Sequence, residues 1–243
     1  MKTILNKATK SAELYVYEDI GGGWFGGVSS KDVADELKKL GDSVDRLTVR
    51  LNSPGGSVFE GVAIYNLLLS AKPEVHVVVD GLAASIASVV AMAGKTISMA
   101  DNAMMMIHDP WGMAVGSADE MRRQAETLDA VRDVLVATYT KRTGQRGEDI
   151  SDWMHAETWM TAAQATELGF ADSTQEADKL AARCDMSRYP YCVPPAYAEM
   201  KTRVTAPPKL SDEMRDMLGH MKASAMRHRL DRIKTTLTRG TKR

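Results

Sequence analysis

The sequence of 243 residues predicts an α/β fold whose sheet is mostly parallel. Short runs rich in Val, Ile and Leu, typical of strands, alternate along the chain with segments that carry helix-capping signals. Apolar residues make up 44% of the chain, which is enough for a substantial core. The alternation and the composition together favour one main domain built from repeated strand-helix units.

The elements of the first half follow from local patterns. Residues 13–17 and 46–51 alternate polar and apolar side chains, which is typical of strands. Between these strands, Ser29 is a suitable N-cap and Gly41 a suitable terminator, so a helix is predicted that ends at Leu40. A second helix is predicted over 58–69, since Pro73 prevents its continuation, and a strand over 75–80 follows.

In the second half, residues 81–85 are predicted to form a turn into a helix that reaches residue 93, and residues 103–108 to form a buried strand. Ser117 with Glu120, and Thr161 with Gln164, have the spacing of capping boxes. They predict a long helix that ends near residue 144 and a short one that ends at residue 169. The long helix places one apolar stripe along its length: Met121, Ala125, Leu128, Val131, Leu135 and Tyr139.

Charge divides the chain into regions. Residues 1–180 contain 17 Lys and Arg against 26 Asp and Glu, whereas residues 201–243 contain 12 against 4. We therefore predict a domain over 1–180, a Pro-rich linker over 181–210 and a basic amphipathic helical tail over 211–243. Such a tail suits an acidic protein partner, and it is the only segment whose charge suits nucleic acid.

Other segments narrow the class of protein. Cys184 and Cys192 lack the ligand set of a zinc site, and we expect free thiols in a reducing cytosol. Asp80 and Gly81 interrupt the most apolar run, so a buried strand and helix are predicted there instead of a membrane span. The N-terminus has no signal-peptide pattern. We expect a soluble cytoplasmic protein without metal or cofactor.

Residues 52–56, Asn-Ser-Pro-Gly-Gly, directly follow a predicted strand. Because glycines lack side chains, their backbone can approach a bound carbonyl closely and direct N–H groups at it. Such donors stabilise the oxyanion of a tetrahedral intermediate in acyl transfer. Taken alone, the pattern fits an ordinary strand-to-helix turn equally well.

A serine and a histidine could complete an acyl-transfer site. Ser85 lies at the start of a predicted helix among Ala83, Ala84 and Ala87, whose small side chains leave room for a substrate. A serine in that position is also a common N-cap. Ser88 is a second candidate, one turn deeper in the helix. His108 ends a buried strand, where an imidazole can act as a general base.

In order and spacing, these segments resemble the Clp-type serine peptidases, the ClpP family, over about residues 14–172. The matching motifs are Asn-Ser-Pro-Gly-Gly at 52–56, the Gly-x-Ala-Ser-type turn at 81–85 and Met-Ile-His-x-Pro at 106–110. The resemblance implies a ClpP/crotonase-like fold that assembles into a homo-oligomeric ring. It also implies Ser85 as nucleophile, His108 as base, and the N–H groups of Gly56 and Ile86 as oxyanion hole.

The third catalytic residue departs from the family pattern. The family usually has an aspartate before an aromatic-x-Ser/Thr-Ala segment, whereas this chain has Glu157 before Trp159-Met160-Thr161-Ala162. A glutamate can also orient an imidazole, although its additional methylene changes its reach. Asp152 and Asp172 are alternatives, and Glu157 is preferred.

Within the family, the chain is more similar to the ClpP-like head maturation proteases of tailed bacteriophages than to host-type ClpP chains. The similar features are the Gly-rich loop with Trp24 and Phe25, residues 108–112 and residues 157–159. This similarity implies an ATP-independent serine endopeptidase that cleaves capsid scaffold and coat proteins inside the prohead, in the bacterial host cytoplasm. The Pro-rich linker additionally suggests self-cleavage between residues 175 and 210.

Three other functions remain open at this point. A host-type ClpP subunit would have the same catalytic residues but would work with a separate ATPase. A crotonase-like acyl-CoA-binding protein would use a similar oxyanion hole without the Ser/His pair. An inactive structural component of the capsid would retain the fold alone.

Overall fold

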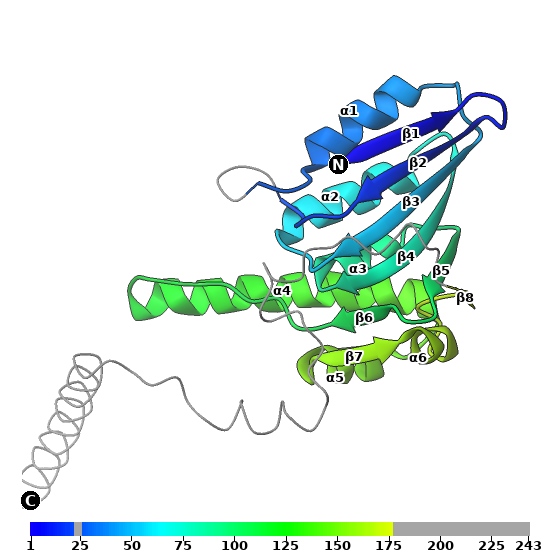
Figure 1. The fold of residues 1–243 in the computed structure, drawn as a ribbon. Helices are drawn as coiled ribbons and strands as arrows, with labels where there is room; N and C mark the ends of the chain where they lie inside the picture. Colours follow the sequence, from blue (N-terminus) through cyan, green and yellow to red (C-terminus); the bar gives the residue numbers. More distant parts are fainter. Residues whose placement is uncertain (22–25, 177–243) are drawn as a thin grey trace, which may run out of the picture. The chain divides into compact units, whose positions relative to one another are not determined.

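The structure is a computed structural model, which describes residues 1–21 and 26–176 of the chain (Figure 1). In these residues one sheet contains eight strands: β1 (Lys2–Asn6), β2 (Ser11–Val16), β3 (Arg46–Ser53), β4 (Glu74–Ala84), β5 (Thr96–Ala100), β6 (Met104–Ile107), β7 (Thr158–Thr161) and β8 (Ser173–Gln175). The helices of the same residues are α1 (Ser30–Leu40), α2 (Val58–Leu69), α3 (Ile86–Ala91), α4 (Ala118–Thr143), α5 (Gly147–His155) and α6 (Ala162–Glu167).

The sheet is mostly parallel, which confirms the predicted fold class. Its main path has the order β1-β2-β3-β4-β5-β8, and only the β1–β2 and β6–β7 pairs are antiparallel in the described chain. β4 pairs with β5 through its first half and with β6 through its second half. Because β6 and β3 flank the second half of β4, the carboxyl ends of three parallel strands lie together, as Figure 1 shows.

The core lies between one face of the sheet and the helices. Alternate side chains of the central strands are fully buried, including Leu14, Val49 and Val77, and they form one apolar cluster with residues of α1, α2 and α3. This period of two is what a strand with one buried face requires. In α3 every residue is buried, so this short helix is held by packing on all sides.

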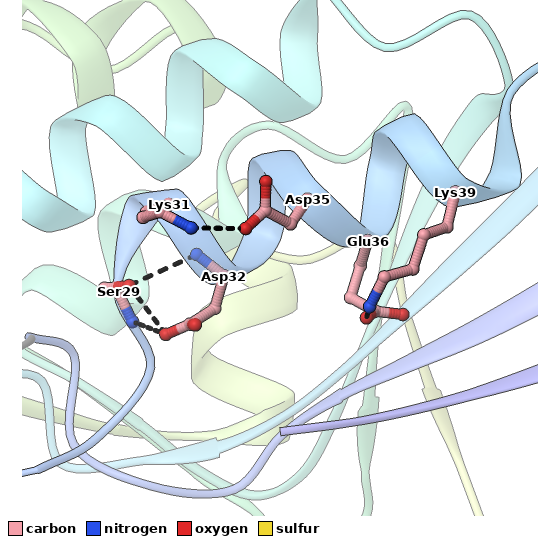
Figure 2. A network of polar contacts seen from close by, with 6 residues as sticks. All are labelled: Ser29, Lys31, Asp32, Asp35, Glu36 and Lys39. Carbon is pink, nitrogen blue, oxygen red and sulfur yellow. Dashed lines mark hydrogen bonds and ion pairs between the residues drawn. The ribbon is translucent and has the colours of Figure 1, made fainter.

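Local capping signals position the helices. At the start of α1, the Ser29 hydroxyl accepts from the Asp32 N–H while the Asp32 carboxylate accepts from the Ser29 N–H (Figure 2). Figure 2 also shows the ion pairs Lys31–Asp35 and Glu36–Lys39 along the exposed side of the helix. The predicted capping boxes of α4 and α6 are present too, at Ser117 and Thr161. All three sites satisfy N–H groups that would otherwise lack an acceptor.

The opposite face of the sheet carries a polar network across β2, β3 and β4. The Arg50 guanidinium donates to both carboxylate oxygens of Asp80, with 2.8 Å from Nε to Oδ2, and the Tyr17 hydroxyl donates to Oδ2 at 2.5 Å. The Asp80 side chain is 2% exposed and that of Arg50 is 12% exposed. Asp80 lies where the β3–β4 register shifts, so the network holds the two strands together just before their carboxyl ends.

Several predictions of elements were wrong or incomplete. Residues 81–84 continue β4 instead of forming a turn, because Leu82–Ala84 pair with β6. Four strands and α5 were not predicted: β1, β5, β7, β8 and the helix over Gly147–His155. These strands are short, and β1 and β8 are largely exposed, so no apolar alternation marks them. They form because a neighbouring strand supplies hydrogen-bond partners.

Some predictions lie outside the described residues. These are the linker over 181–210, the helical tail over 211–243, the loop residues Trp24 and Phe25, and both cysteines. In the described part of the chain, no helix combines the length and the apolar character that a membrane span needs.

Candidate active site

Ser85 lies between the end of β4 and the start of α3. Its backbone has φ 55° and ψ −131°, a conformation that non-glycine residues rarely adopt. Such strain persists only where surrounding contacts hold it, and it is concentrated at functional sites. The Ser85 N–H donates to the carbonyl of Met106 on β6 at 2.9 Å, which ties the serine to the neighbouring strand. The serine side chain is only half-buried, so it is accessible.

His108 directly follows β6, and its Nε2 lies 2.7 Å from the Ser85 Oγ. The two side chains are 23 residues apart in sequence, and the β4–β6 pairing brings them together. Burial lowers the pKa of His108, while the negative charges of Glu157 and Asp109 partly oppose that shift. The imidazole is therefore neutral near pH 7 and can accept the serine proton.

The glycine loop lies against the serine. A Cβ on Gly55 would be 2.7 Å from the Ser85 Cβ and 3.2 Å from the Ile86 nitrogen, so only glycine permits this approach. The loop is held by Ile20, whose N–H donates to the Gly55 carbonyl and whose carbonyl accepts from the Ser57 N–H, both at 2.7 Å. Sequence reasoning did not identify Ile20, because no local pattern links it to residues 55–57.

Two backbone N–H groups in the segments around the serine have no acceptor among the described residues. Gly56 is exposed, and its N–H makes no hydrogen bond to another described residue. Ile86 is the first residue of α3, where an N–H has no acceptor within its own helix. Both predicted oxyanion donors thus belong to segments that the structure brings next to Ser85.

The three candidate acids are placed differently. Glu157 is exposed, and its carboxylate accepts from the Trp159 Nε1 at 3.3 Å. No hydrogen bond between Glu157 and His108 is present in the described residues, although the Glu157 charge raises the pKa of His108. Asp172 accepts from the Ile97 N–H and from Arg142, both at 2.6 Å, so it joins β5 to α4 instead of contacting His108.

Asp152 lies on the exposed side of α5, and its carboxylate has no hydrogen bond or ion pair with a described residue. Of the three acids, only Glu157 influences the imidazole. Asp109, which sequence reasoning did not consider, is a further negative charge close to His108 and pairs with His155 at 3.1 Å.

A pocket of about 240 Å³ lies between the segment that follows His108 and helix α4. Its wall begins at Asp109 and Pro110, directly after His108, and continues on α4 with Ala125, Leu128, Asp129 and Arg132. Apolar atoms form part of this lining and charged groups the remainder. Neither Ser85 nor His108 lines this pocket.

Comparison with known proteins agrees with this geometry. A family model described as Clp protease matches residues 4–178. The chain is 34% identical over 149 residues to the ATP-dependent Clp protease proteolytic subunit 1 of Prochlorococcus marinus. The aligned region covers 60% of this chain and 76% of that protein. It is 36% identical over 125 residues to the ATP-dependent Clp protease proteolytic subunit 2 of Parasynechococcus marenigrum, 51% of this chain and 64% of that protein.

Solved structures show the same likeness. A mutant of ClpP1 from Listeria monocytogenes superposes with a TM-score of 0.60 at 25% identity, covering 68% of this chain and 91% of that chain. The matched family model spans well over half of the chain and includes every residue of the site described above. The chain therefore belongs to the Clp protease family of serine peptidases.

Proposed function

We propose that this protein is a serine endopeptidase in which Ser85 and His108 carry out the chemistry. The Ser85 Oγ attacks the carbonyl carbon of a peptide bond and passes its proton to the His108 Nε2. His108 then protonates the leaving amine as the C–N bond breaks and an acyl-enzyme remains. A water molecule gives its proton to His108 and attacks the ester carbonyl; the bond from the acyl carbon to the Ser85 Oγ then breaks, and His108 returns the proton to the serine.

The observation that carries this proposal is the 2.7 Å distance between the Ser85 Oγ and the His108 Nε2. Three further features support it: the strained serine backbone, the lowered pKa of His108, and the N–H groups of Gly56 and Ile86, which have no acceptor in the described part of the chain. The two donors would bind the oxyanion, and removal of one such donor typically costs roughly 3–4 kcal/mol of transition-state stabilisation.

Glu157 is the third catalytic residue in this proposal, and it acts through its charge. Without a hydrogen bond to the ring, it favours the imidazolium that forms when His108 takes the proton. Asp109 contributes in the same direction.

Labelling with a fluorophosphonate probe tests the proposal directly. The wild-type protein should form one covalent adduct at Ser85, while Ser85→Ala and His108→Ala should form none. Ser70→Ala is a suitable control, because Ser70 is an exposed serine at the C-terminus of α2. An unlabelled wild-type protein that is folded and assembled would refute the enzymatic function.

We further propose that the substrates are capsid scaffold and coat proteins, cleaved inside a phage prohead in the host cytoplasm. Support comes from the sequence: the segments around His108 and Glu157 resemble phage head maturation proteases, and residues 201–243 have the excess of positive charge that an acidic scaffold would attract. Incubation with purified candidate scaffold and coat proteins, without ATP, should yield defined fragments. Undegraded scaffold in the presence of an enzyme that labels with the probe would contradict this role.

A second role is favoured by the names of the relatives, which are called ATP-dependent proteolytic subunits. In that role the chain would be a host-type subunit that requires a separate ATPase. The two roles differ in one measurement: degradation of a folded protein that begins only when an unfoldase and ATP are added favours the host-type subunit.

Self-association is part of the proposal, in the form of a homo-oligomeric ring. The first half of α4 projects without cover in the described chain, and the loop before it exposes Trp111, Met113 and Val115, with Met113 91% exposed. Contiguous exposed apolar groups of this kind mark protein contacts. Analytical ultracentrifugation should show an oligomer, and a monomer at micromolar concentration would contradict it.

A further inference from the structure

A buried chain of hydroxyl groups leads from α4 to the backbone of Ser85. The Tyr139 hydroxyl on α4 lies 2.8 Å from the Ser88 Oγ, and the Ser88 Oγ lies 2.6 Å from the Ser85 carbonyl oxygen. Ser88 is 0% exposed and Tyr139 is 2% exposed. The Ser88 N–H also donates to the Ser85 carbonyl, at 3.0 Å. The proposed catalytic mechanism uses neither Ser88 nor Tyr139.

The direction of these hydrogen bonds follows from the chemistry of the groups. A carbonyl oxygen can only accept, so the single proton of the Ser88 hydroxyl is donated to Ser85. The Tyr139 hydroxyl must therefore donate to Ser88. Burial raises the pKa of Tyr139, so this hydroxyl keeps its proton near neutral pH.

The orientation of the Ser85 carbonyl has a consequence for the oxyanion site. The described chain contains no cis peptide bond, so the Ser85 carbonyl and the Ile86 N–H point in opposite directions from one rigid plane. A group that fixes the carbonyl on one side thereby fixes the N–H on the other. The Ile86 nitrogen also lies close to Gly55, on the side where the glycine loop approaches.

We infer that Ser88 and Tyr139 are positioning residues that lock the Ser85–Ile86 peptide plane, and so aim the Ile86 N–H at the developing oxyanion. This inference rests on the proposed function. The strained conformation of Ser85 explains why a lock is needed, since an unsupported peptide at φ 55° would relax to a more favourable orientation. Because α4 supplies the last hydroxyl, the lock also connects the long helix to the catalytic site.

Kinetics of the assembled full-length protein test the inference. Tyr139→Phe removes only the hydroxyl and keeps the ring, which packs against Phe170. We expect kcat for a fluorogenic peptide to fall about fivefold with an unchanged KM, the effect of losing one ordinary hydrogen bond in the transition state. The affinity for a peptide boronate, whose tetrahedral adduct occupies the oxyanion site, should fall by the same factor.

Ser88→Ala should reduce kcat at least as much, and Tyr139→Phe should add little in the Ser88→Ala background because both act through one hydrogen-bonded chain. Tyr65→Phe is the matched control, because Tyr65 is a partly buried tyrosine of α2 whose hydroxyl has no hydrogen bond to another described residue. The kcat of the Tyr65→Phe variant should equal that of the wild type.

The outcomes are distinguishable. A wild-type protein that reacts with neither fluorophosphonate nor peptide overturns the proposed function and the inference together. An active wild type with Tyr139→Phe and Ser88→Ala variants that keep their kcat within a factor of about two overturns the inference alone. A changed KM with an unchanged boronate affinity also overturns it, because the effect would then lie in substrate binding.

Discussion

Replacing Gly55 with alanine tests how closely the glycine loop must approach Ser85. The new Cβ would lie 2.7 Å from both the Ser85 Cβ and the Ala84 carbonyl oxygen. Carbon atoms in contact normally stand about 3.5–4.0 Å apart, so the loop must retreat by about 1 Å. A displacement of that size near the reacting atoms can cost about 100-fold in rate. We therefore expect kcat to fall by about two orders of magnitude.

Gly144→Ala is the control for backbone strain. Gly144 also has a positive φ, +74°, but a Cβ there would meet no atom within 4 Å, and it follows the C-terminus of α4. Both substitutions cost about 1 kcal/mol of strain, because L-residues disfavour positive φ. For a domain of this size that cost lowers Tm by about 2–4 °C. Only Gly55→Ala should also lose activity.

The assay combines thermal unfolding by circular dichroism with the rate of fluorophosphonate labelling, expressed per folded molecule. A loss of Tm in Gly55→Ala at least as large as that in Gly144→Ala, together with a roughly 100-fold slower reaction of Gly55→Ala, would match the geometry. If Gly55→Ala reacts within about threefold of the wild type, the loop does not need its present distance from Ser85 and does not form the oxyanion site.

Three other predictions concern charge. Glu157→Gln removes a charge that raises the pKa of His108, so the acid limb of the profile of kcat/KM against pH should move to lower pH. Asp152→Asn, the control, should leave the acid limb in place. If the profiles of Glu157→Gln and the wild type coincide, Glu157 is excluded as the electrostatic partner of His108. Burial lowers the pKa of His108 in the folded state below 6.5, so the unfolded chain binds the proton first as pH falls. The free energy of unfolding should therefore decrease as pH drops from about 6.5 through the lower folded-state pKa. In urea denaturation at a series of pH values, His108→Gln should flatten this dependence, and an unchanged slope of unfolding free energy against pH would contradict the burial effect. Asp80→Ala leaves the Arg50 guanidinium buried without its carboxylate, so the free energy of unfolding should drop by roughly 3–5 kcal/mol in urea titrations, and a loss below about 1 kcal/mol would show that water replaces the partner.

The helices were the most predictable part of the fold. Their boundaries depend on contacts within a few residues, such as Ser29 with Asp32 and Ser117 with Glu120, and these signals are complete in the sequence. The strands with clear alternation were equally predictable. β1 and β8 were not, because their stability comes from pairing with β2 and β5, which no pattern inside the short segments announces.

The site shows the same division. The sequence by itself determined the candidate reactive groups: a serine among small residues, a histidine after a buried strand, and a glycine pair after another, in an order that resembles one peptidase family. Only the tertiary structure decided their geometry, because the distance from Ser85 to His108 depends on which strands pair and in which register.

The acid and the supporting residues depended still more on the fold. Three acids were compatible with the sequence, and their contacts differ: Asp172 accepts from Ile97 and Arg142, while the Glu157 charge raises the pKa of His108. Tyr139 lies 51 residues from Ser88, and no local pattern could pair them. Chemical identity is a property of single residues, whereas distance, burial and orientation arise only when remote segments pack together.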